Sequence, residues 1–188
     1  MSQRAVMIDR DGVINNDGDH VWKIDQLKIL PRVSEAIQML NDHGWIVIVI
    51  TNQPVVARGW ATEADVEALH AEIGRRIAPA RIDRWYYCPH HPEATLPEYR
   101  LDCPDRKPKT GFILRAQKDF SLALPECYVI GDLPADIKMG TDSGCRTILV
   151  KTGFAGVEKN PKRDYRVQPD AVADNLLAAV KLIIKAGK

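Results

Sequence analysis

The sequence predicts an α/β protein built on a doubly wound parallel sheet. Three short runs of continuous apolar residues, at 5–8, 45–50 and 127–130, are typical of strands buried on both faces. Amphipathic helical segments separate these runs, and strands that alternate with helices imply right-handed crossovers. Because no inserted segment is long enough for a large cap domain, we expect residues 1–188 to fold as one domain.

The composition is that of a soluble globular protein, with 45% hydrophobic and 27% charged residues. The 26 basic residues nearly balance the 25 acidic ones, so the net charge of +1 gives no electrostatic case for binding nucleic acid or a membrane surface. No apolar run reaches membrane-spanning length, and the first residues lack a signal-peptide core. We therefore expect a cytoplasmic protein, and its composition fits a monomer.

The first predicted strand, 5–8, ends in the sequence Asp9-Arg10-Asp11-Gly12. A carboxylate at the end of a buried strand is costly unless a cation or hydrogen bonds compensate it, and the aspartates at i and i+2 can converge on one divalent metal. A polar turn, with Gly12 supplying a positive φ, is the alternative interpretation of these residues alone. The polar segment 15–28 then forms a loop over the strand ends.

The other elements follow from apolar periodicity and from helix start and stop signals. Pro31 begins a helix that ends near Gly44, and Thr62 with Asp65 is typical of a cap for the helix that Pro79 ends. The remaining predicted elements are a strand at 45–50, a strand at 85–88, a helix from 110, a strand at 127–130, a helix at 135–143, a strand at 146–150, a short edge strand at 171–172 and a helix at 174–185.

Polar residues follow three of the predicted strands: Asp9 and Asp11 the first, Thr51 the second, and Asp132 the one that ends at Gly131. Lys107 precedes a helix that leads into that last strand. The carboxyl ends of parallel strands share one edge of a sheet, where α/β proteins bind ligands. Carboxylates, a hydroxyl and an ammonium group together suit Mg²⁺ and a phosphoryl group.

This order of motifs resembles the haloacid dehalogenase superfamily of phosphohydrolases, from Asp9 to about residue 152. The resemblance implies that Asp9 is the nucleophile, which forms an aspartyl-phosphate, and that Asp11 is the general acid and base. It also implies that Mg²⁺ is held by the Asp9 carboxylate, the Asp11 main-chain carbonyl and the Asp132 carboxylate. Thr51 and Lys107 bind the phosphoryl oxygens, where charge lies in the transition state.

The proline-rich loop at about 88–108 carries a second candidate metal site. Cys88, His90, Cys103 and Asp105 offer two thiolates, an imidazole and a carboxylate, which make a tetrahedral set for structural Zn²⁺. An empty loop or a Cys88–Cys103 pair is the alternative, although a reducing cytosol disfavours a disulfide. Related phosphatases have a cysteine where Asp105 stands, so the exchange for a harder ligand lowers the expected zinc affinity.

Within the superfamily, residues 86–92, 106–108, 51–53 and 57–59 resemble the D-glycero-D-manno-heptose 1,7-bisphosphate 7-phosphatases. Histidinol-phosphate phosphatases share much of this plan and remain an alternative. The resemblance implies Mg²⁺-dependent hydrolysis of the C7 phosphate of a small phosphorylated sugar, in the making of nucleotide-activated heptose. Arg106 joins the predicted catalytic residues. The candidate substrate-binding residues are Asp17, Gly18, Asp19, His20, Thr51, Asn52, Gln53, Pro54, Arg106 and Lys107.

A phospho-accepting receiver-type module is the alternative outside the enzymes, because such domains are also doubly wound and are phosphorylated on aspartate. Receiver modules lack a second acid placed like Asp11 for turnover, and they are shorter than this chain. The sequence therefore favours the phosphatase.

Overall fold

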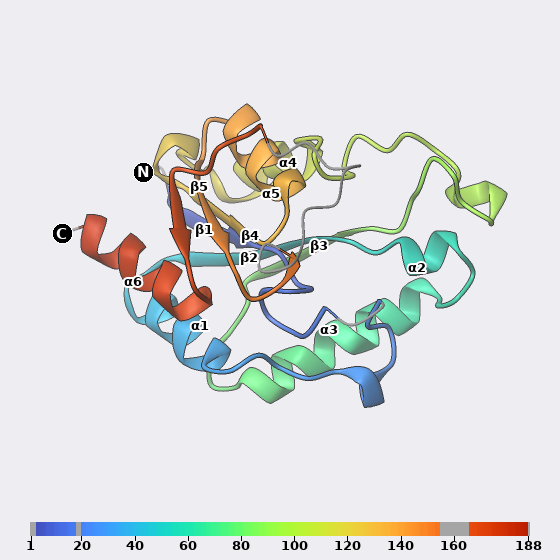
Figure 1. Cartoon of the computed structure of the whole chain (residues 1–188), viewed down its shortest axis with the longest axis horizontal. Helices are drawn as coiled ribbons and strands as arrows, with labels where there is room; N and C mark the ends of the chain where they lie inside the picture. Colours follow the sequence, from blue (N-terminus) through green and yellow to red (C-terminus); the bar gives the residue numbers. More distant parts are fainter. Residues whose placement is uncertain (1–2, 18–19, 155–165, 188) are drawn as a thin grey trace.

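The core of the molecule is a parallel β-sheet with helices on both faces (Figure 1). The computed structural model describes residues 3–17, 20–154 and 166–187. In these residues the sheet has six strands in the order β3-β2-β1-β4-β5-β6, and every neighbouring pair is parallel. This order confirms the predicted doubly wound α/β sheet. The strands are β1 (Ala5–Ile8), β2 (Ile46–Asn52), β3 (Arg84–Cys88), β4 (Tyr128–Gly131), β5 (Arg146–Val150) and β6 (Ala171–Ala173).

The two faces of the sheet are covered by different helices, because successive side chains of each buried strand point to opposite faces. In β1, Val6 and Ile8 pack into a core with α1, α3 and α6, whereas Ala5 and Met7 pack into a second core with α4. Helix α5 lies against β4 and β5, on the side of the second core. The helices are α1 (Val33–Asp42), α2 (Pro54–Ala57), α3 (Glu63–Ile77), α4 (Gly111–Phe120), α5 (Pro134–Asp142) and α6 (Leu176–Ala186).

Most element boundaries lie within two residues of the prediction, and the differences have local causes. The capping arrangement of Thr62 with Asp65 is present, since Thr62 Oγ1 accepts from Asp65 N at 3.2 Å. The short helix α2 was not predicted, because one turn is too short to show periodicity. Three 3₁₀ helices, Ile24–Gln26, Pro97–Tyr99 and Leu124–Glu126, were also not predicted.

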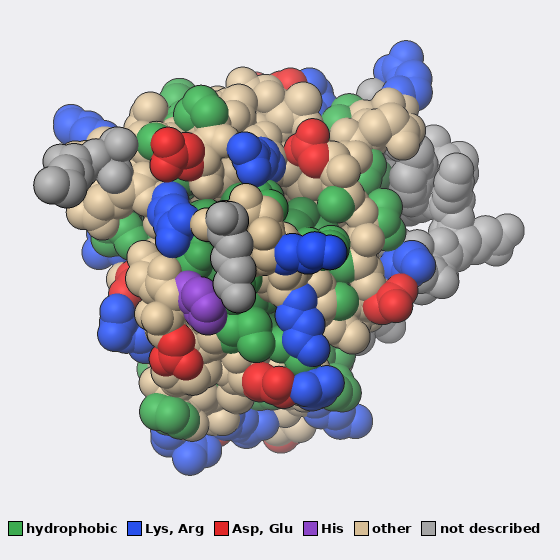
Figure 2. Space-filling view, turned by 90° about the vertical axis from the view of Figure 1, so that its left-hand side faces the viewer, with side chains coloured by type: hydrophobic (Ala, Val, Ile, Leu, Met, Phe, Trp, Pro, Cys, Tyr) green, Lys and Arg blue, Asp and Glu red, His purple; other side chains and the backbone are tan. Residues whose placement is uncertain are grey.

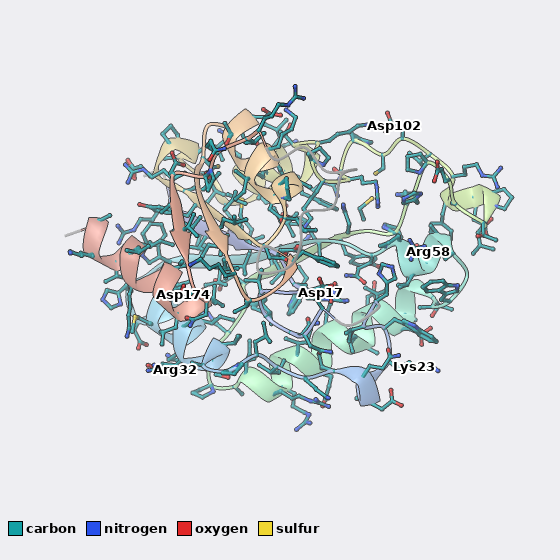
Figure 3. The ribbon with its side chains drawn as sticks, viewed as in Figure 1. Asp17, Lys23, Arg32, Arg58, Asp102 and Asp174 are labelled. Carbon is teal, nitrogen blue, oxygen red and sulfur yellow. The ribbon has the colours of Figure 1, made fainter. Side chains whose placement is uncertain are left out.

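The long loops and the chain termini lie on opposite sides of the molecule. In Figure 1 both termini lie on the left, whereas α2 and the loop after β3 extend to the right. Arg58 and Asp102 lie toward the loop side, away from Asp174 near the start of α6 (Figure 3). On the face seen in Figure 2, acidic and basic side chains are interspersed, in keeping with the net charge of +1. Among the described residues, no helix is long and apolar enough to cross a membrane.

Candidate active site

Three of the predicted strand-end residues, Asp9, Asp11 and Thr51, line one cavity of about 470 Å³. The residues that line the cavity come from segments far apart in the chain. Strands β1 and β2 both end at it, because parallel neighbours end at the same edge of the sheet. It is lined by Asp9, Asp11, Asp17, His20, Thr51, Asn52, Pro54, Arg58, Arg106, Lys107, Leu133, Ala135 and Phe154.

Lys107 lies between two buried carboxylates at the floor of the cavity. Its Nζ is 2.7 Å from Asp9 Oδ1 and 2.6 Å from Asp136 Oδ1, and all three residues are buried. Burial lowers the pKa of Lys107, but Asp136 and Asp9 outweigh that effect and raise it. Burial also raises the pKa of Asp9, against the opposing effect of Lys107. The lysine therefore stays charged and holds Asp9 in a fixed orientation.

The main chain of Lys107 is fixed by Asn52 at the end of β2. Lys107 N donates to Asn52 Oδ1 at 3.1 Å, and Asn52 Nδ2 donates to the Lys107 carbonyl at 3.2 Å. This two-bond contact attaches the loop before α4 to the neighbouring strand end. Asn52, predicted to bind substrate, thus also positions Lys107.

Asp132 has one carboxylate oxygen without a partner. Phe154 N donates to its Oδ2 at 2.7 Å, whereas the buried Oδ1 has no hydrogen-bond partner. Burial and the nearby Asp136 raise the pKa of Asp132 to about 7. The turn after β1 approaches closely here: Gly12 has φ +80°, and a Cβ on it would lie 2.6 Å from Asp132 Oδ2.

Three carboxylates meet at this point and fit a hard divalent cation. Oxygens of Asp9, Asp132 and Asp136 all lie within 4.8 Å of one another. Oxygen ligands suit Mg²⁺, and a buried oxygen without a partner is a position where a cation compensates the cost of burial. Asp136, four residues after Asp132, lies in the first turn of α5. It caps α5, since Leu133 N donates to its Oδ2 at 3.1 Å, and it also pairs with Lys107.

Asp11 is held by a hydrogen-bond network centred on the fully buried Arg10. Arg10 Nη2 lies 2.9 and 3.0 Å from the two Asp11 oxygens and also donates to the Val21 carbonyl at 2.8 Å. Asn15 Nδ2 donates to Asp11 Oδ1 at 2.9 Å. Burial raises the pKa of Asp11, but the Arg10 charge and the hydrogen bonds outweigh it and lower the pKa. Asp11 is therefore a carboxylate in this arrangement.

Gln53 lies beneath the cavity and connects the segment after β1 with the end of β2. Its Nε2 donates to Asp11 Oδ2 at 2.8 Å and to Thr51 Oγ1 at 2.9 Å, and its Oε1 accepts from Arg10 Nη2 at 2.9 Å. Gln53 is 2% exposed and is absent from the cavity lining. This placement differs from the expected substrate contact, because Gln53 uses its amide on Asp11, Thr51 and Arg10.

His70 on α3 completes the support for Arg10. Its Nε2 lies 3.3 Å from Arg10 Nη1, and its ring stacks on Trp85 with centroids 4.4 Å apart. Burial and the Arg10 charge lower the pKa of His70 to about 3, so the ring is neutral and one nitrogen can accept from the guanidinium. Neither Arg10 nor His70 was predicted at the site, because helical spacing marks His70 only as a residue on the buried face of α3.

Most of the predicted site residues line the cavity, and the structure adds others. Asp9, Asp11, Thr51, Arg106 and Lys107 converge as expected. Asp17, His20 and Pro54 also line the cavity, whereas Gly18 and Asp19 lie outside the described residues. The lining residues that were not predicted are Arg58, Leu133, Ala135 and Phe154. Leu133 and Ala135 flank Pro134 at the start of α5, directly after Asp132, which was a usable signal. Arg58 lies in the segment 57–59 that carries the family resemblance, whereas Phe154 gave no signal.

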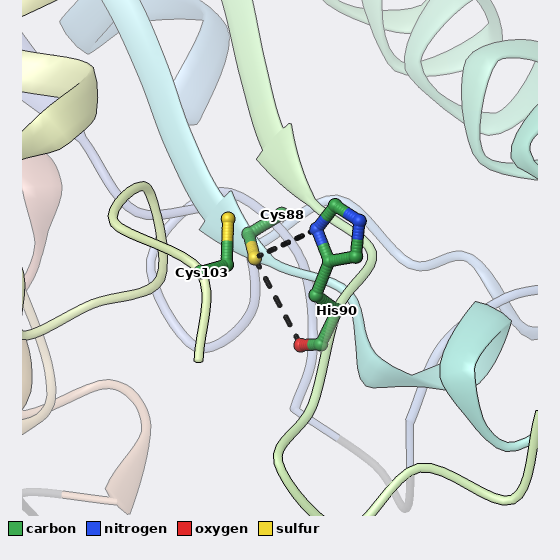
Figure 4. Close-up of side chains that lie close together, drawn as sticks. All are labelled: Cys88, His90 and Cys103. Carbon is green, nitrogen blue, oxygen red and sulfur yellow. Dashed lines mark hydrogen bonds between the residues drawn. The ribbon is translucent and has the colours of Figure 1, made fainter. Parts of the chain in front are cut away.

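The cysteine loop brings together three of its four predicted metal ligands. Sγ of Cys88, a ring nitrogen of His90 and Sγ of Cys103 all lie within 4.8 Å of one another, with 3.9 Å between Cys88 Sγ and His90 Nδ1 (Figure 4). Burial raises the pKa of the Cys88 thiol to about 12. Asp105, predicted as the fourth ligand, is not in this group, because its carboxylate pairs with Arg115 on α4 at 2.6 Å. That prediction is therefore corrected for the structure as it stands.

Comparison with known proteins agrees with this geometry. A family model for HAD-like hydrolases matches residues 105–179. A D-glycero-D-manno-heptose-1,7-bisphosphate 7-phosphatase of Thermosynechococcus vestitus is 34% identical, over 97% of this chain and 96% of its own length. The chain belongs to this phosphatase family. It is a HAD-like hydrolase of phosphoric monoesters.

Two further relatives extend the likeness. The D-glycero-beta-D-manno-heptose-1,7-bisphosphate 7-phosphatase of Rhodopseudomonas palustris is 41% identical to this chain. The match covers 74% of this chain and 79% of the R. palustris protein. A crystal structure of the heptose 1,7-bisphosphate phosphatase from B. bronchiseptica, complexed with magnesium and phosphate, is 27% identical and superposes with a TM-score of 0.83. The match covers 98% of this chain and 99% of that one.

Proposed function

We propose that this phosphatase removes the C7 phosphate of D-glycero-D-manno-heptose 1,7-bisphosphate in a Mg²⁺-dependent reaction. The observation that supports the reaction type is that Asp9 and Lys107 line one cavity and that Asp132 lies beside Asp9. The substrate is proposed because relatives that match most of the chain are named heptose-1,7-bisphosphate 7-phosphatases. We further propose that it works as a cytoplasmic monomer in the making of nucleotide-activated heptose.

Asp9 is the nucleophile of the proposed reaction. Its Oδ1 accepts from Arg10 N at 2.7 Å and pairs with Lys107, which leaves Oδ2 as the attacking oxygen. A bond forms between Oδ2 and phosphorus while the bond from phosphorus to the sugar oxygen breaks. The product of this step is an aspartyl-phosphate, and the leaving alkoxide takes a proton from Asp11. Lys107 and the Thr51 hydroxyl stabilise the charge on the phosphoryl oxygens.

Asp11 has two tasks that require different protonation states. As a carboxylate bound by Arg10 and Gln53, it suits the second step, in which it takes a proton from the water that attacks phosphorus. That attack breaks the bond to Asp9 and releases inorganic phosphate. A protonated Asp11 is a poor partner for a guanidinium, so in the first step we expect it to turn from Arg10 toward the leaving oxygen.

The Mg²⁺ in this proposal is held by the carboxylates of Asp9 and Asp132 and by the main-chain carbonyl of Asp11. The unpartnered Oδ1 of Asp132 and the cluster with Asp136 support this assignment. When bound, the ion neutralises charge on the phosphate, which lets a carboxylate approach it.

We also propose a structural Zn²⁺ in the cysteine loop, held by Cys88, His90 and Cys103. The loop from β3 to α4 contains only a short 3₁₀ helix, so it gains little rigidity from regular structure. A metal there fixes the backbone beside Arg106, whose Nη1 donates to the His90 carbonyl at 3.0 Å.

The test is a comparison of kcat/KM for heptose 1,7-bisphosphate and histidinol phosphate in Mg²⁺. We expect the bisphosphate to be preferred and to lose only its C7 phosphate, which phosphorus NMR of the product reports. A higher kcat/KM for histidinol phosphate would assign the alternative substrate. Normal turnover by Asp9→Asn would refute the mechanism, and a stable phosphoaspartate without phosphate release would instead indicate a receiver-type module.

A further inference from the structure

The metal-binding atoms of the cysteine loop form a set of three. Cys88 closes β3, His90 follows two residues later, and Cys103 comes from the returning part of the loop (Figure 4). Both cysteines are buried, with exposed fractions of 1% and 6%. A tetrahedral zinc ion needs four donors, and a set of three protein ligands leaves one position open.

Asp105 is held away from this set by contacts on both of its carboxylate oxygens. Its Oδ2 accepts from Arg115 Nη2 at 2.6 Å. Its Oδ1 packs against the first residue of α4, since a Cβ added to Gly111 would overlap it. Arg115 is itself placed over the Phe112 ring, 5.5 Å from the centroid. The carboxylate thus belongs to a local cluster at the start of α4.

A zinc ion and two thiolates are neutral together without a third anionic ligand. Two thiolates neutralise a zinc ion, and Asp105 and Arg115 neutralise each other. Arg106 adds a positive charge beside His90, to whose carbonyl it donates. Moving Asp105 to the metal would leave Arg115 unpaired, and the carboxylate is a harder ligand than the sulfur and imidazole donors already present.

We infer that the loop binds zinc through only Cys88 Sγ, His90 Nδ1 and Cys103 Sγ, with Asp105 remaining on Arg115. The fourth position then accepts a small donor from solution: water, an imidazole or a low-molecular-weight thiol. This inference rests on the zinc site proposed above and is independent of the phosphatase reaction. It makes the metal exchangeable through that position, which a site closed by four protein ligands does not allow.

The experiment replaces zinc with Co²⁺ in the full-length protein, with excess Mg²⁺ to occupy the carboxylate site. Absorption from thiolate-to-cobalt charge transfer reports the cysteine site alone, and imidazole is the added probe. Three variants accompany the wild type: Asp105→Asn removes the carboxylate charge, Asp105→Cys supplies a fourth ligand, and Cys103→Ser removes an existing one. Circular dichroism confirms that each variant is folded. Zinc affinity is measured in parallel by competition with a chromogenic chelator.

We expect imidazole to shift the cobalt ligand-field bands of the wild type and of Asp105→Asn to saturation, without loss of metal. Asp105→Asn should bind zinc within about twofold of the wild type. Asp105→Cys should bind zinc more tightly than the wild type, and imidazole should not shift its cobalt bands. Cys103→Ser should weaken the charge-transfer band, because only the Cys88 thiolate remains, and should weaken zinc binding by more than the roughly 10- to 100-fold typical of indirect effects.

Three results would overturn the inference and are distinguishable from one another. If imidazole does not shift the cobalt bands of the wild type and Asp105→Asn binds zinc more weakly, Asp105 is the fourth ligand. If imidazole shifts the bands of neither the wild type nor Asp105→Asn, another side chain is the fourth ligand. A wild type without thiolate-to-cobalt absorption would remove the zinc site itself. Turnover of a phosphate ester by the same samples reports separately on the proposed function.

Discussion

Replacing Lys107 with methionine removes the cation between Asp9 and Asp136 while keeping most of the side-chain volume. At an effective dielectric constant of about 20, each ion pair near 2.7 Å contributes roughly 6 kcal/mol of Coulomb attraction before desolvation is subtracted. Breaking a buried pair by removing one partner costs about 3–5 kcal/mol of the free energy of unfolding. The loss of a preorganised phosphate donor should also lower kcat/KM by about 10²–10³.

Urea unfolding and steady-state kinetics measure the two effects of this substitution. Lys109→Met is the matched control, because Lys109 pairs with the exposed Asp102 on the surface and should change stability by no more than about 0.5 kcal/mol. The destabilisation by Lys107→Met should shrink as the pH falls, since protonation of Asp9, whose pKa is raised, ends the pairing. Wild-type stability and kcat/KM in Lys107→Met would refute the role given to this ammonium group.

Three further predictions follow. The pKa of Asp132 is about 7 without metal, and a proton on this carboxylate competes with Mg²⁺. The apparent Mg²⁺ affinity, measured by calorimetry, should therefore fall about tenfold per pH unit below that value and level off above it. An affinity independent of pH would contradict this. In the metal-free protein, the raised pKa values of Asp9 and Asp132 mean that the folded state binds more protons than the unfolded state, so stability in urea unfolding should fall as the pH rises toward 7. Gln53→Ala removes a hydrogen bond to the charged Asp11 that is worth about 1.5–3 kcal/mol, so kcat should fall by about 10- to 150-fold. A rise in KM alone would instead favour the substrate contact that the sequence predicted for Gln53. Leu40→Ala should cost about 2–5 kcal/mol in urea unfolding, against about 0.5 kcal/mol or less for the half-exposed Leu114→Ala; equal losses would contradict the core assignment.

The sheet and the strand-end residues were predictable because their signals are local. A run such as 5–8 identifies a buried strand, and the rule that parallel strands end at one edge places Asp9, Thr51 and Asp132 together. Asp9 and Thr51 do line the cavity, and Asp132 lies beside Asp9. The order of the strands across the sheet was not predicted, because no single segment of the sequence determines it.

The supporting network was not predictable because it depends on tertiary contacts. Nothing near Arg10 in the sequence indicates that its side chain meets His70, 60 positions later, or that Gln53 lies beneath the cavity. The spacing of Cys103 and Asp105 likewise suited two ligands of one metal. Asp105 instead pairs with Arg115 on α4, and the spacing of residues in the sequence does not indicate that contact.

The most direct test of the proposed chemistry is to quench the enzyme during turnover of heptose 1,7-bisphosphate in Mg²⁺ and map any phosphorylated residue by mass spectrometry. The account predicts a phosphoryl group on the peptide that contains Asp9, at early times and in the wild type only, with none in Asp9→Asn. Steady phosphate release from an enzyme whose Asp9 is never modified, or a phosphoryl group on another residue, would contradict it.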